Sequence, residues 1–307
     1  MSQINLIQVL IAFLIFPGLL FALPMGWMMM WLERKSLARM QGRIGPPFFQ
    51  PFFDFIKLMA KRPIARLQWE SNIYTGLALL AVGANLGALT LLPIFLNPSA
   101  EVGDLILFVA LAEIAPICWI LAGFASRSIF GQVGAVREAT LTIASNLPFI
   151  TALIALASAA KSLQMSELVT QPALPVRLLG LLALLICLPV RLRLNPFSLP
   201  NAEQEIYSGA VTEFDGARLA LWELAHALEW VMLSGLVICL ACPWRSALWW
   251  VNVLLFGLGC LLMAILLTTF AAATARLKIS QASNLFWRWG FGVSLLALIV
   301  ALIPLGV

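Results

Sequence analysis

The sequence predicts an all-α integral membrane protein with eight transmembrane helices, and three observations lead to that prediction. Apolar residues make up 62% of the 307 residues and charged residues only 11%. Soluble domains average about 25% charged residues. Several apolar stretches are long enough to cross a bilayer, which takes about 20 residues. The basic residues, finally, are concentrated in alternate connections between these stretches.

The predicted spans follow the apolar stretches of the chain. We place them near residues 4–31, 73–96, 104–125, 139–160, 175–192, 217–241, 247–274 and 284–306. The first stretch is too long for a signal peptide and lacks a basic leading segment, so we interpret it as a retained helix. Strands are not predicted, because no alternation of apolar and polar residues repeats. No long polar stretch interrupts the pattern, so we expect one transmembrane domain over residues 1–307.

The distribution of basic residues predicts the orientation of the spans. Sixteen of the 19 Lys and Arg residues fall in or beside four connections, whereas Lys161, Arg177 and Arg245 belong to the other side. The four basic connections are near residues 32–72, 126–138, 193–216 and 275–283. Cytoplasmic loops are enriched in Lys and Arg. We therefore expect these loops in the cytoplasm, both termini outside, and a multi-pass protein of the inner (cytoplasmic) membrane. The loop bias also explains the net charge of +5 without a nucleic-acid partner.

The first basic connection contains a predicted short helix between Pro47 and Lys61. Its apolar residues recur at helical spacing, and its charged residues occupy the other side. This pattern is typical of a helix that lies at the membrane interface or covers the mouth of a cavity. A simple loop helix would have the same geometry.

Ionisable residues inside the predicted spans are the candidates for a functional path, because a charge within a bilayer is costly and marks a pathway or a paired site. Glu113 lies in the third span, and Glu138 opens the fourth together with Arg137. In the sixth span, Glu223, His226 and Glu229 recur every three residues. These three side chains therefore share broadly one helix face.

Two interpretations of this set stay open. In a proton relay, the histidine exchanges protons near neutral pH, and burial raises the pKa of the carboxyl groups toward that range. In a structural pairing, the same acids form ion pairs with Arg137, Arg191 or Arg218 and hold the helices together.

Further acidic residues precede the sixth span on the basic side of the chain. They are Glu203, Glu205, Glu213 and Asp215, which we add to the candidate proton path. Prolines stiffen this stretch, which favours a formed funnel or docking surface over a solvated loop. No nucleophile and base are arranged for hydrolysis, and a single histidine cannot build a metal site. We therefore predict no catalytic residue and no metal site.

The five cysteines lie in or next to apolar spans, and we interpret them as small buried thiols. Cys239 and Cys242 have the spacing of a redox pair but no partner pair, and no iron–sulfur pattern occurs. The sequence therefore predicts no cofactor in this chain.

Three stretches carry a resemblance to a known family. The first runs from Glu33 to Leu58, the second is Gly134–Ala139, and the third extends from Pro196 to Gly216. The second is similar to the family's Gly-x-x-Arg, and the third to its Pro-Phe-Asp-Leu-Pro-Glu-Ala-Glu and Thr-Glu-Tyr-Ser-Gly segments. Together they resemble the complex I membrane subunit called subunit 1 or H, and its counterparts in group 4 membrane-bound NiFe hydrogenases and formate hydrogenlyase. With the eight spans, the resemblance covers essentially the whole chain.

One spacing within the first stretch resembles the hydrogenase lineage. Complex I members usually carry about ten residues between their Gly-Pro and Gln-Pro pairs, whereas Gly45-Pro46 and Gln50-Pro51 are separated here by three residues. The resemblance implies a membrane subunit that docks a soluble electron-transfer arm and couples redox chemistry to ion translocation. It implies as partners hydrogenase-like large and small subunits, which would carry the NiFe centre and iron–sulfur clusters, and antiporter-like membrane subunits.

The charge of the first connection makes it the expected docking segment for the soluble arm. The candidates are Arg34, Lys35, Arg39, Arg43, Asp54 and Lys57. The alternative is a quinone-reducing complex I subunit, in which a mouth near Arg39, Asp54 and Glu213 would admit a quinone. An independent secondary transporter would contain inverted repeats, and none is visible.

The chain departs from the family pattern where the family carries acids. Ser198 and Asn201 replace two carboxylates of the Pro-Phe segment, and Arg191 and His226 stand where glutamates are frequent. The expected proton path is therefore depleted in acidic groups.

Overall fold

A computed structural model describes residues 11–62, 68–94, 103–243 and 248–303. The described residues form helices and contain no strand, apart from one isolated bridge between Asp104 and Gln164. The membrane-length helices are α2 (Leu19–Met40), α4 (Gln68–Thr90), α5 (Leu105–Ala125), α6 (Ile129–Ala160), α8 (Leu174–Arg191), α10 (Gly216–Ala241), α11 (Trp249–Ala273) and the continuous run α12 (Ile279–Leu285), η3 (Phe286–Gly290) and α13 (Phe291–Leu302). The short elements are α3 (Gln50–Ala60), α7 (Met165–Thr170), α9 (Glu203–Ile206) and η2 (Gly209–Glu213).

Eight helices in the described residues are long and apolar enough to cross a membrane. This confirms the predicted number and order of spans. In lipid each backbone group needs a partner within its own segment, which is why the apolar stretches are helical and tolerate internal prolines. The chain is thus a multi-pass membrane protein.

Two predicted boundaries were wrong. The first helix extends to Met40, so Arg34, Lys35 and Arg39 lie on helix α2 rather than in a loop. The fourth begins at Ile129, so Glu138 is an internal helix residue rather than the first of its span. In both helices the charged residues ended the apolar pattern but not the helical backbone.

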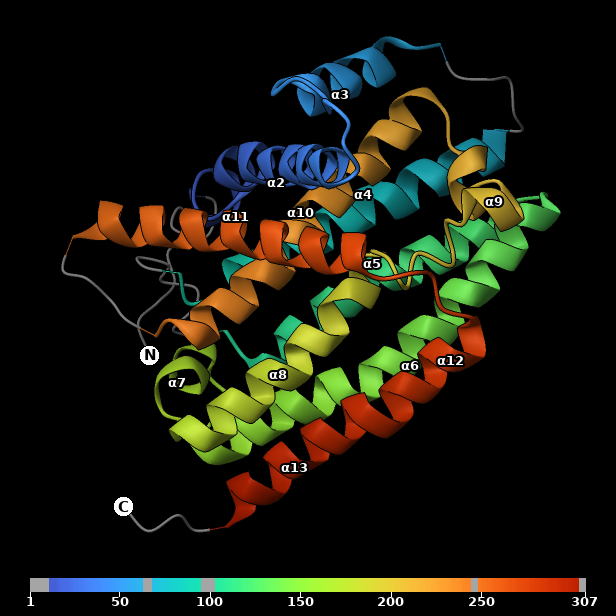
Figure 1. Ribbon diagram of the computed structural model, residues 1–307. Helices are drawn as coiled ribbons and strands as arrows, with labels where there is room; N and C mark the ends of the chain where they lie inside the picture. Colours follow the sequence, from blue (N-terminus) through green and yellow to red (C-terminus); the bar gives the residue numbers. More distant parts are fainter. Residues whose placement is uncertain (1–10, 63–67, 95–102, 244–247, 304–307) are drawn as a thin grey trace.

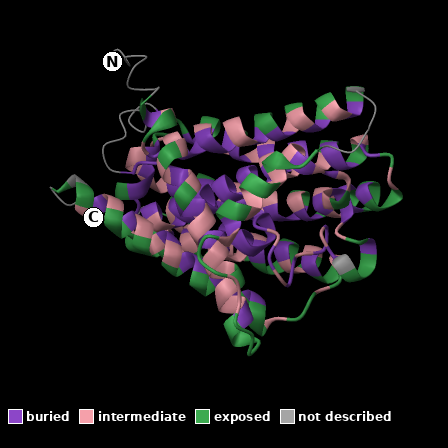
Figure 2. Cartoon of the chain, turned by 90° about the horizontal axis from the view of Figure 1, so that it is seen from above, coloured by how far each residue is buried: buried purple, intermediate pink, exposed green. Residues whose placement is uncertain are grey.

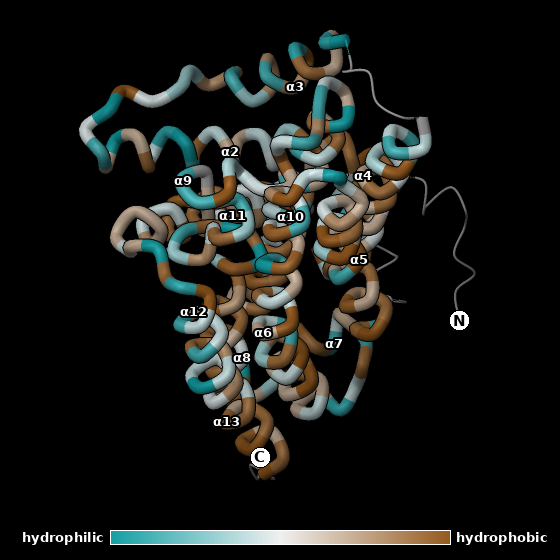
Figure 3. The backbone as a smooth tube through the Cα atoms, turned by 90° about the vertical axis from the view of Figure 1, so that its right-hand side faces the viewer, coloured by the Kyte–Doolittle hydropathy of each residue, from teal (hydrophilic) through white to brown (hydrophobic). Residues whose placement is uncertain are grey.

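The helices form one bundle in which α9 and α12 lie at one end and α7 lies at the other (Figure 1). Helix α3 packs against α2 and α10, and the rings of Phe52 and Phe55 contact Trp27 of α2. The short helix predicted between Pro47 and Lys61 is therefore present as Gln50–Ala60. Hydrophilic residues gather around α3, α9 and the start of α12, whereas α5 and α13 are mainly apolar (Figure 3).

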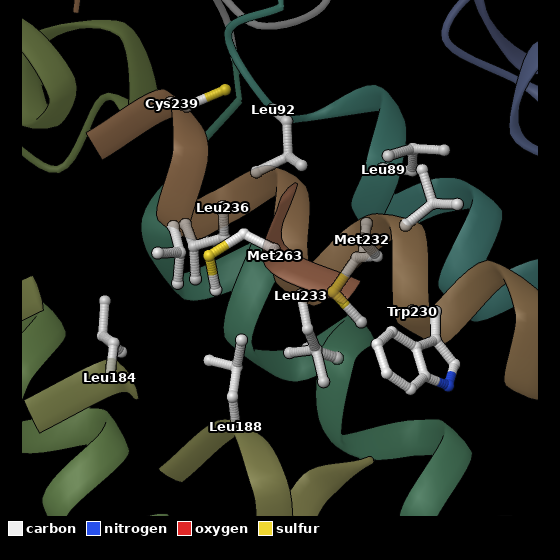
Figure 4. Close-up of a cluster of buried hydrophobic side chains, with 14 of the residues drawn as sticks. Leu89, Leu92, Leu184, Leu188, Trp230, Met232, Leu233, Leu236, Cys239 and Met263 are labelled. Carbon is white, nitrogen blue, oxygen red and sulfur yellow. The ribbon is translucent and has the colours of Figure 1, made fainter. Parts of the chain in front are cut away.

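Helix α10 is the centre of the bundle. Its most apolar window is 83% buried, more than that of the other candidate spans in the described residues. Buried residues lie inside the bundle and exposed ones on its outer faces (Figure 2). Around α10 the core contains Leu89 of α4 and Leu92 just beyond its end, Leu184 and Leu188 of α8, and Trp230 with its neighbours (Figure 4).

Helices α2 and α10 approach each other closely at a glycine. A Cβ atom added at Gly26 would lie 2.5 Å from the carbonyl oxygen of Ala227. Small residues at helix crossings let backbones approach in membrane proteins. This contact fixes the position of α2 beside the ionisable face of α10.

Candidate functional site: a buried ionic cluster

The centre of the site is Arg193, a residue that follows the last turn of α8. Its Nε atom donates to Glu138 of α6 and its Nη1 atom to Glu229 of α10, each at 3.0 Å. All three side chains are nearly inaccessible, with exposed fractions of 7% for Arg193, 6% for Glu138 and 4% for Glu229. One guanidinium at the end of α8 therefore joins the interiors of α6 and α10 through two buried carboxylates.

The charge of Arg193 is fixed by this environment. Burial alone would lower the pKa of Arg193, but the carboxylates of Glu138 and Glu229 outweigh it and raise that pKa above its ordinary value. The guanidinium also lies 4.8 Å from the ring centroid of Trp119, a cation–π distance. Arg193 is therefore a permanent cation in this cluster.

His226 extends the cluster along α10. The indole Nε1 of Trp230 donates to His226 Nε2 at 3.2 Å, and His226 Nδ1 lies 3.4 Å from Glu229. Because Nε2 accepts a hydrogen bond, the neutral ring carries its hydrogen on Nδ1 and directs it at the carboxylate. Protonation of Nε2 requires the indole N–H to turn away.

A second ionic group lies next to the first. Arg191 pairs with Glu113 of α5 and donates to Asn146 Oδ1 of α6 at 2.7 Å, and Asn146 Nδ2 donates to Glu113 at 2.7 Å. The guanidinium lies 3.8 Å from the ring centroid of Phe149. Its buried Nε atom has no hydrogen-bond partner. Arg191 thus neutralises the one acid of the third span.

Three cavities border these groups. One of about 230 Å³ lies between α2, α3 and α10 and is lined by Arg34, Asp54 and Glu223 among others. A second, of about 80 Å³, is lined by Glu223, His226 and Arg193. A third, of about 10 Å³, lies between Glu138 and the Arg191 group. Glu223 therefore borders both of the larger cavities.

Two unpaired polar atoms line the 80 Å³ cavity. The buried indole nitrogen of Trp222 and the buried amide oxygen of Asn201 have no hydrogen-bond partner within the protein. A buried polar group without a partner costs free energy, and a polar cavity of this volume has room for water.

The structure gathers part of the predicted proton path. Glu138, His226 and Glu229 are brought together by Arg193, with Glu223 at the edge of the same cavity. Glu113 belongs to the neighbouring group on Arg191. These contacts combine residues of α5, α6 and α10.

Other candidates of that path lie apart from the cluster. Glu205 of α9 pairs with Arg137 of α6 at 2.5 Å, and Asp215 pairs with Arg218 at the start of α10 at 2.6 Å. Glu213 ends η2. The side chain of Glu203 lies outside the described part of the structure.

Two members of the site were not among the predicted residues. Arg193 was counted only as a basic loop residue, and of the three proposed arginine partners only Arg191 pairs with an acid inside a span. Glu33 of α2 is the second, because its carboxyl group is electrostatically coupled to His226 and Glu223. Glu33 is the first residue of the Glu33–Leu58 stretch that resembles the family, and this position could have pointed to it from the sequence.

The docking candidates lie on α2, on α3 and on the connection between these two helices. Arg34 forms an ion pair with Asp54 at 3.2 Å, and Lys57 lines the 230 Å³ cavity. Lys35 donates to the carbonyl oxygen of Pro46 at 3.5 Å. Arg39 and Arg43 are exposed, and the side chain of Arg43 contacts Gln41. Arg66, counted in the same connection, lies outside the described residues.

Among the described residues, no three His, Cys, Asp or Glu side chains are grouped so that they could hold a metal ion. Cys118, Cys187, Cys239 and Cys260 are buried, and Cys242 is exposed. The expectation that cofactors belong to partner subunits stays a prediction.

The bundle and its buried ionic cluster define a multi-pass membrane protein with ionisable groups at its centre. The family model for NADH dehydrogenase matches residues 11–302. The chain belongs to the NADH dehydrogenase family.

A solved structure supports the same fold. The chain is similar to one in the membrane-bound sulfane sulfur reductase (MBS), described as an archaeal respiratory membrane complex. The TM-score is 0.85 at 24% sequence identity, over 96% of this chain and 98% of the other. The match thus extends over nearly the full length of both chains.

Proposed function

We propose that this chain is the membrane subunit of a group 4 hydrogenase-type respiratory complex. In this role it holds the soluble electron-transfer arm and couples electron transfer to ion movement in neighbouring antiporter-like subunits. The observation that carries the proposal is the row of ionisable groups that leads from the 230 Å³ cavity through Glu223 and His226 to Arg193 and Glu138. The likeness to a chain of the archaeal respiratory complex supports it.

Coupling begins at Glu223, which borders both larger cavities. The 80 Å³ cavity, which has room for water beside Trp222 and Asn201, brings this carboxyl group and the imidazole of His226 to one wall. Arg193 does not release its proton, because two carboxylates stabilise its charge. A change of charge at Glu223 or His226 therefore shifts the guanidinium of Arg193 toward one of its two carboxylate partners, Glu229 or Glu138. The signal passes inward as a displacement of charge.

Neutral variants distinguish coupling from structural pairing. Glu223 has no ion-pair partner among the described residues, whereas Glu229 is paired with buried Arg193. We expect Glu223→Gln to leave assembly intact and to reduce ions moved per electron in reconstituted vesicles. Glu229→Gln, the matched change on the same helix face, should lower both coupling and assembly, because it removes one of two carboxylates from a buried cation. If Glu223→Gln assembles and pumps at the wild-type ratio, the coupling proposal fails.

A quinone site is the second candidate function, and one observation favours it. The 230 Å³ cavity combines apolar residues such as Trp27 and Phe55 with the polar groups of Arg34 and Asp54. Its lining includes Asp54 but neither Arg39 nor Glu213, the other two residues expected at a quinone mouth. The short spacing between Gly45 and Pro51 supports the quinone-independent assignment.

The two functions differ in what the purified complex requires. We expect electron transfer to protons, or to another soluble acceptor, without added quinone. A matched preparation with added quinone and a quinone-site inhibitor should show the same rate. Turnover that depends on quinone and stops with the inhibitor would favour the quinone-reducing subunit over the hydrogenase-type subunit.

A further inference from the structure

A polar cavity of about 260 Å³ lies away from the ionic cluster, at the end of the bundle that carries α9 and α12 (Figure 1). Three segments form it: α6, the stretch from Leu199 to Glu205, and the connection between α11 and α12. Its lining residues are Arg137, Leu199, Glu205, Arg276, Leu277, Lys278 and Ile279. The role proposed above for the chain uses none of them.

The charges of this cavity are unbalanced. Arg137 is compensated by Glu205 at 2.5 Å and also donates to the carbonyl oxygen of Leu199 at 3.4 Å. Arg276 and Lys278 are exposed, and neither has a carboxylate partner among the described residues. The cavity therefore holds an excess of two positive charges, and like charges this close favour an anion between them.

The cavity wall is fixed and partly apolar. The backbone N–H of Leu277 donates to the carbonyl oxygen of Pro196 at 3.2 Å, which anchors the connection before α12 against the 194–200 stretch. Leu199 is buried below the cavity, and the side chains of Val136 and Phe270 are exposed on the neighbouring helices α6 and α11. A ligand with one anionic group and apolar chains matches these surroundings.

We propose that this cavity binds the phosphate group of an anionic phospholipid. Basic pockets between transmembrane helices on the cytoplasmic side bind anionic headgroups, and the basic connections, including residues 275–283, are those expected in the cytoplasm. Arginine and lysine beside each other supply directional and freely rotating donors to phosphate oxygens. Acyl chains then lie on the exposed apolar residues of α6 and α11.

The test counts bound lipid on the intact complex. The complex is placed in phosphatidylcholine nanodiscs with rising fractions of phosphatidylglycerol, and retained lipids are counted by native mass spectrometry. Arg276→Gln with Lys278→Gln should weaken retention of phosphatidylglycerol about thirtyfold, at about 1 kcal/mol for each cation. The matched control is Lys161→Gln with Arg288→Gln, which removes two exposed charges that neither line the cavity nor belong to the docking candidates.

A second variant is expected to strengthen the retention of phosphatidylglycerol. Glu205→Gln removes the one carboxylate of the cavity and frees Arg137, so phosphatidylglycerol should bind about fivefold more tightly. Equal retention in the double variant, or an equal loss in the control pair, overturns the proposal. It is also overturned if excess inorganic phosphate at constant ionic strength empties the site, which identifies a free-phosphate site. Loss of a partner subunit with unchanged lipid would show that an acidic protein segment occupies it.

Discussion

Arg193 decides the character of the site at the scale of single residues. Its guanidinium reaches Glu138 through Nε and Glu229 through Nη1, so its planar shape is used as well as its charge. A buried ion pair offers little net stability, but removal of one partner leaves an uncompensated charge and is strongly destabilising. The cluster is therefore easily broken by a single substitution.

Arg193→Lys tests whether the planar fork matters. An ammonium group cannot occupy the Nε and Nη1 positions at once, so one carboxylate loses its partner. We expect a loss of about 2 kcal/mol in the stability of the complex, measured as a lower Tm of the purified assembly. Arg43→Lys, an exposed arginine outside the cluster, is the control and should leave Tm unchanged. A wild-type Tm for Arg193→Lys would mean that charge alone holds the three helices.

The same variant should create a pH dependence that the native protein lacks. The pKa of Arg193 is raised in the folded protein, so its stabilisation is present at lower pH and is lost only above the range of ordinary measurements. Lysine has an ordinary pKa of about 10.4, and the same two carboxylates that raise the pKa of Arg193 also raise that of a lysine at this position. Its stabilisation is therefore present below about pH 10.4 and lost above it. We expect the Tm of Arg193→Lys to fall above about pH 10.4, while that of the native complex stays level. A parallel decline of both would contradict this assignment.

Sequence reasoning found the acids of the site but not their partner, for a physical reason. Glu223, His226 and Glu229 lie on one helix, so their spacing alone places them on one face. Arg193 lies on a connection, and its partners Glu138 and Glu229 are 55 and 36 residues away. Only tertiary packing brings them together.

At the scale of helices, hydropathy predicted the number of spans and missed where two of them begin or end. Lys35 and Arg39 ended the apolar pattern of α2, yet long basic side chains can hold their charge in water while their stems pack on the helix. Glu138 ended the pattern of α6 on its N-terminal side, but Arg193 compensates that charge from another element. Composition cannot distinguish a charge that ends a helix from one that is paired within it.

The close crossing of α2 and α10 gives a prediction about packing. Gly26→Ala places a Cβ atom 2.5 Å from the carbonyl oxygen of Ala227, so the two backbones must separate. We expect a loss of about 1–3 kcal/mol, as for overpacked cores, and a lower yield of assembled complex. Gly76→Ala in α4 is the matched control, because a Cβ atom there meets nothing within 4 Å.

The control should be neutral or slightly stabilising, since alanine favours a helix over glycine. The two Tm values therefore separate helix propensity from interhelical contact. Equal behaviour of Gly26→Ala and Gly76→Ala would show that α2 can shift without cost, and the position of Glu33 beside His226 would then not depend on this crossing.

At the scale of the whole molecule, the two ends of the bundle differ in chemistry. Polar residues gather at the end that carries α9 and α12 (Figure 3). Exposed phenylalanines, such as Phe49 of the α2–α3 connection and Phe53 of α3, add apolar surface. Exposed apolar residues rimmed by charge mark interaction surfaces. This end is the proposed docking side for the soluble arm, and the sequence predicted it from loop charge alone.

Charge reversal on this end tests docking, and the structure selects the residues for it. Arg34 is unsuitable, because its reversal would also break the ion pair with Asp54. Arg39 and Arg43 are exposed and have no ion-pair partner among the described residues. We expect Arg39→Glu with Arg43→Glu to release the soluble arm from purified membranes, because like charges then face each other across the interface.

The matched control reverses Lys161 and Arg177, two basic residues that the loop bias assigns to the opposite side. Both double variants carry the same change of net charge, so a general effect of charge on solubility or insertion would appear in both. The measurement is the fraction of soluble subunits that co-purifies with the membrane subunit, at low and high salt. Since salt screens surface charges that lie more than about 8 Å apart at physiological ionic strength, the extra release caused by Arg39→Glu with Arg43→Glu should decrease as the salt concentration rises. Undiminished co-purification in that variant, or equal release in the control, would place the arm on another surface and remove the link between loop charge and docking.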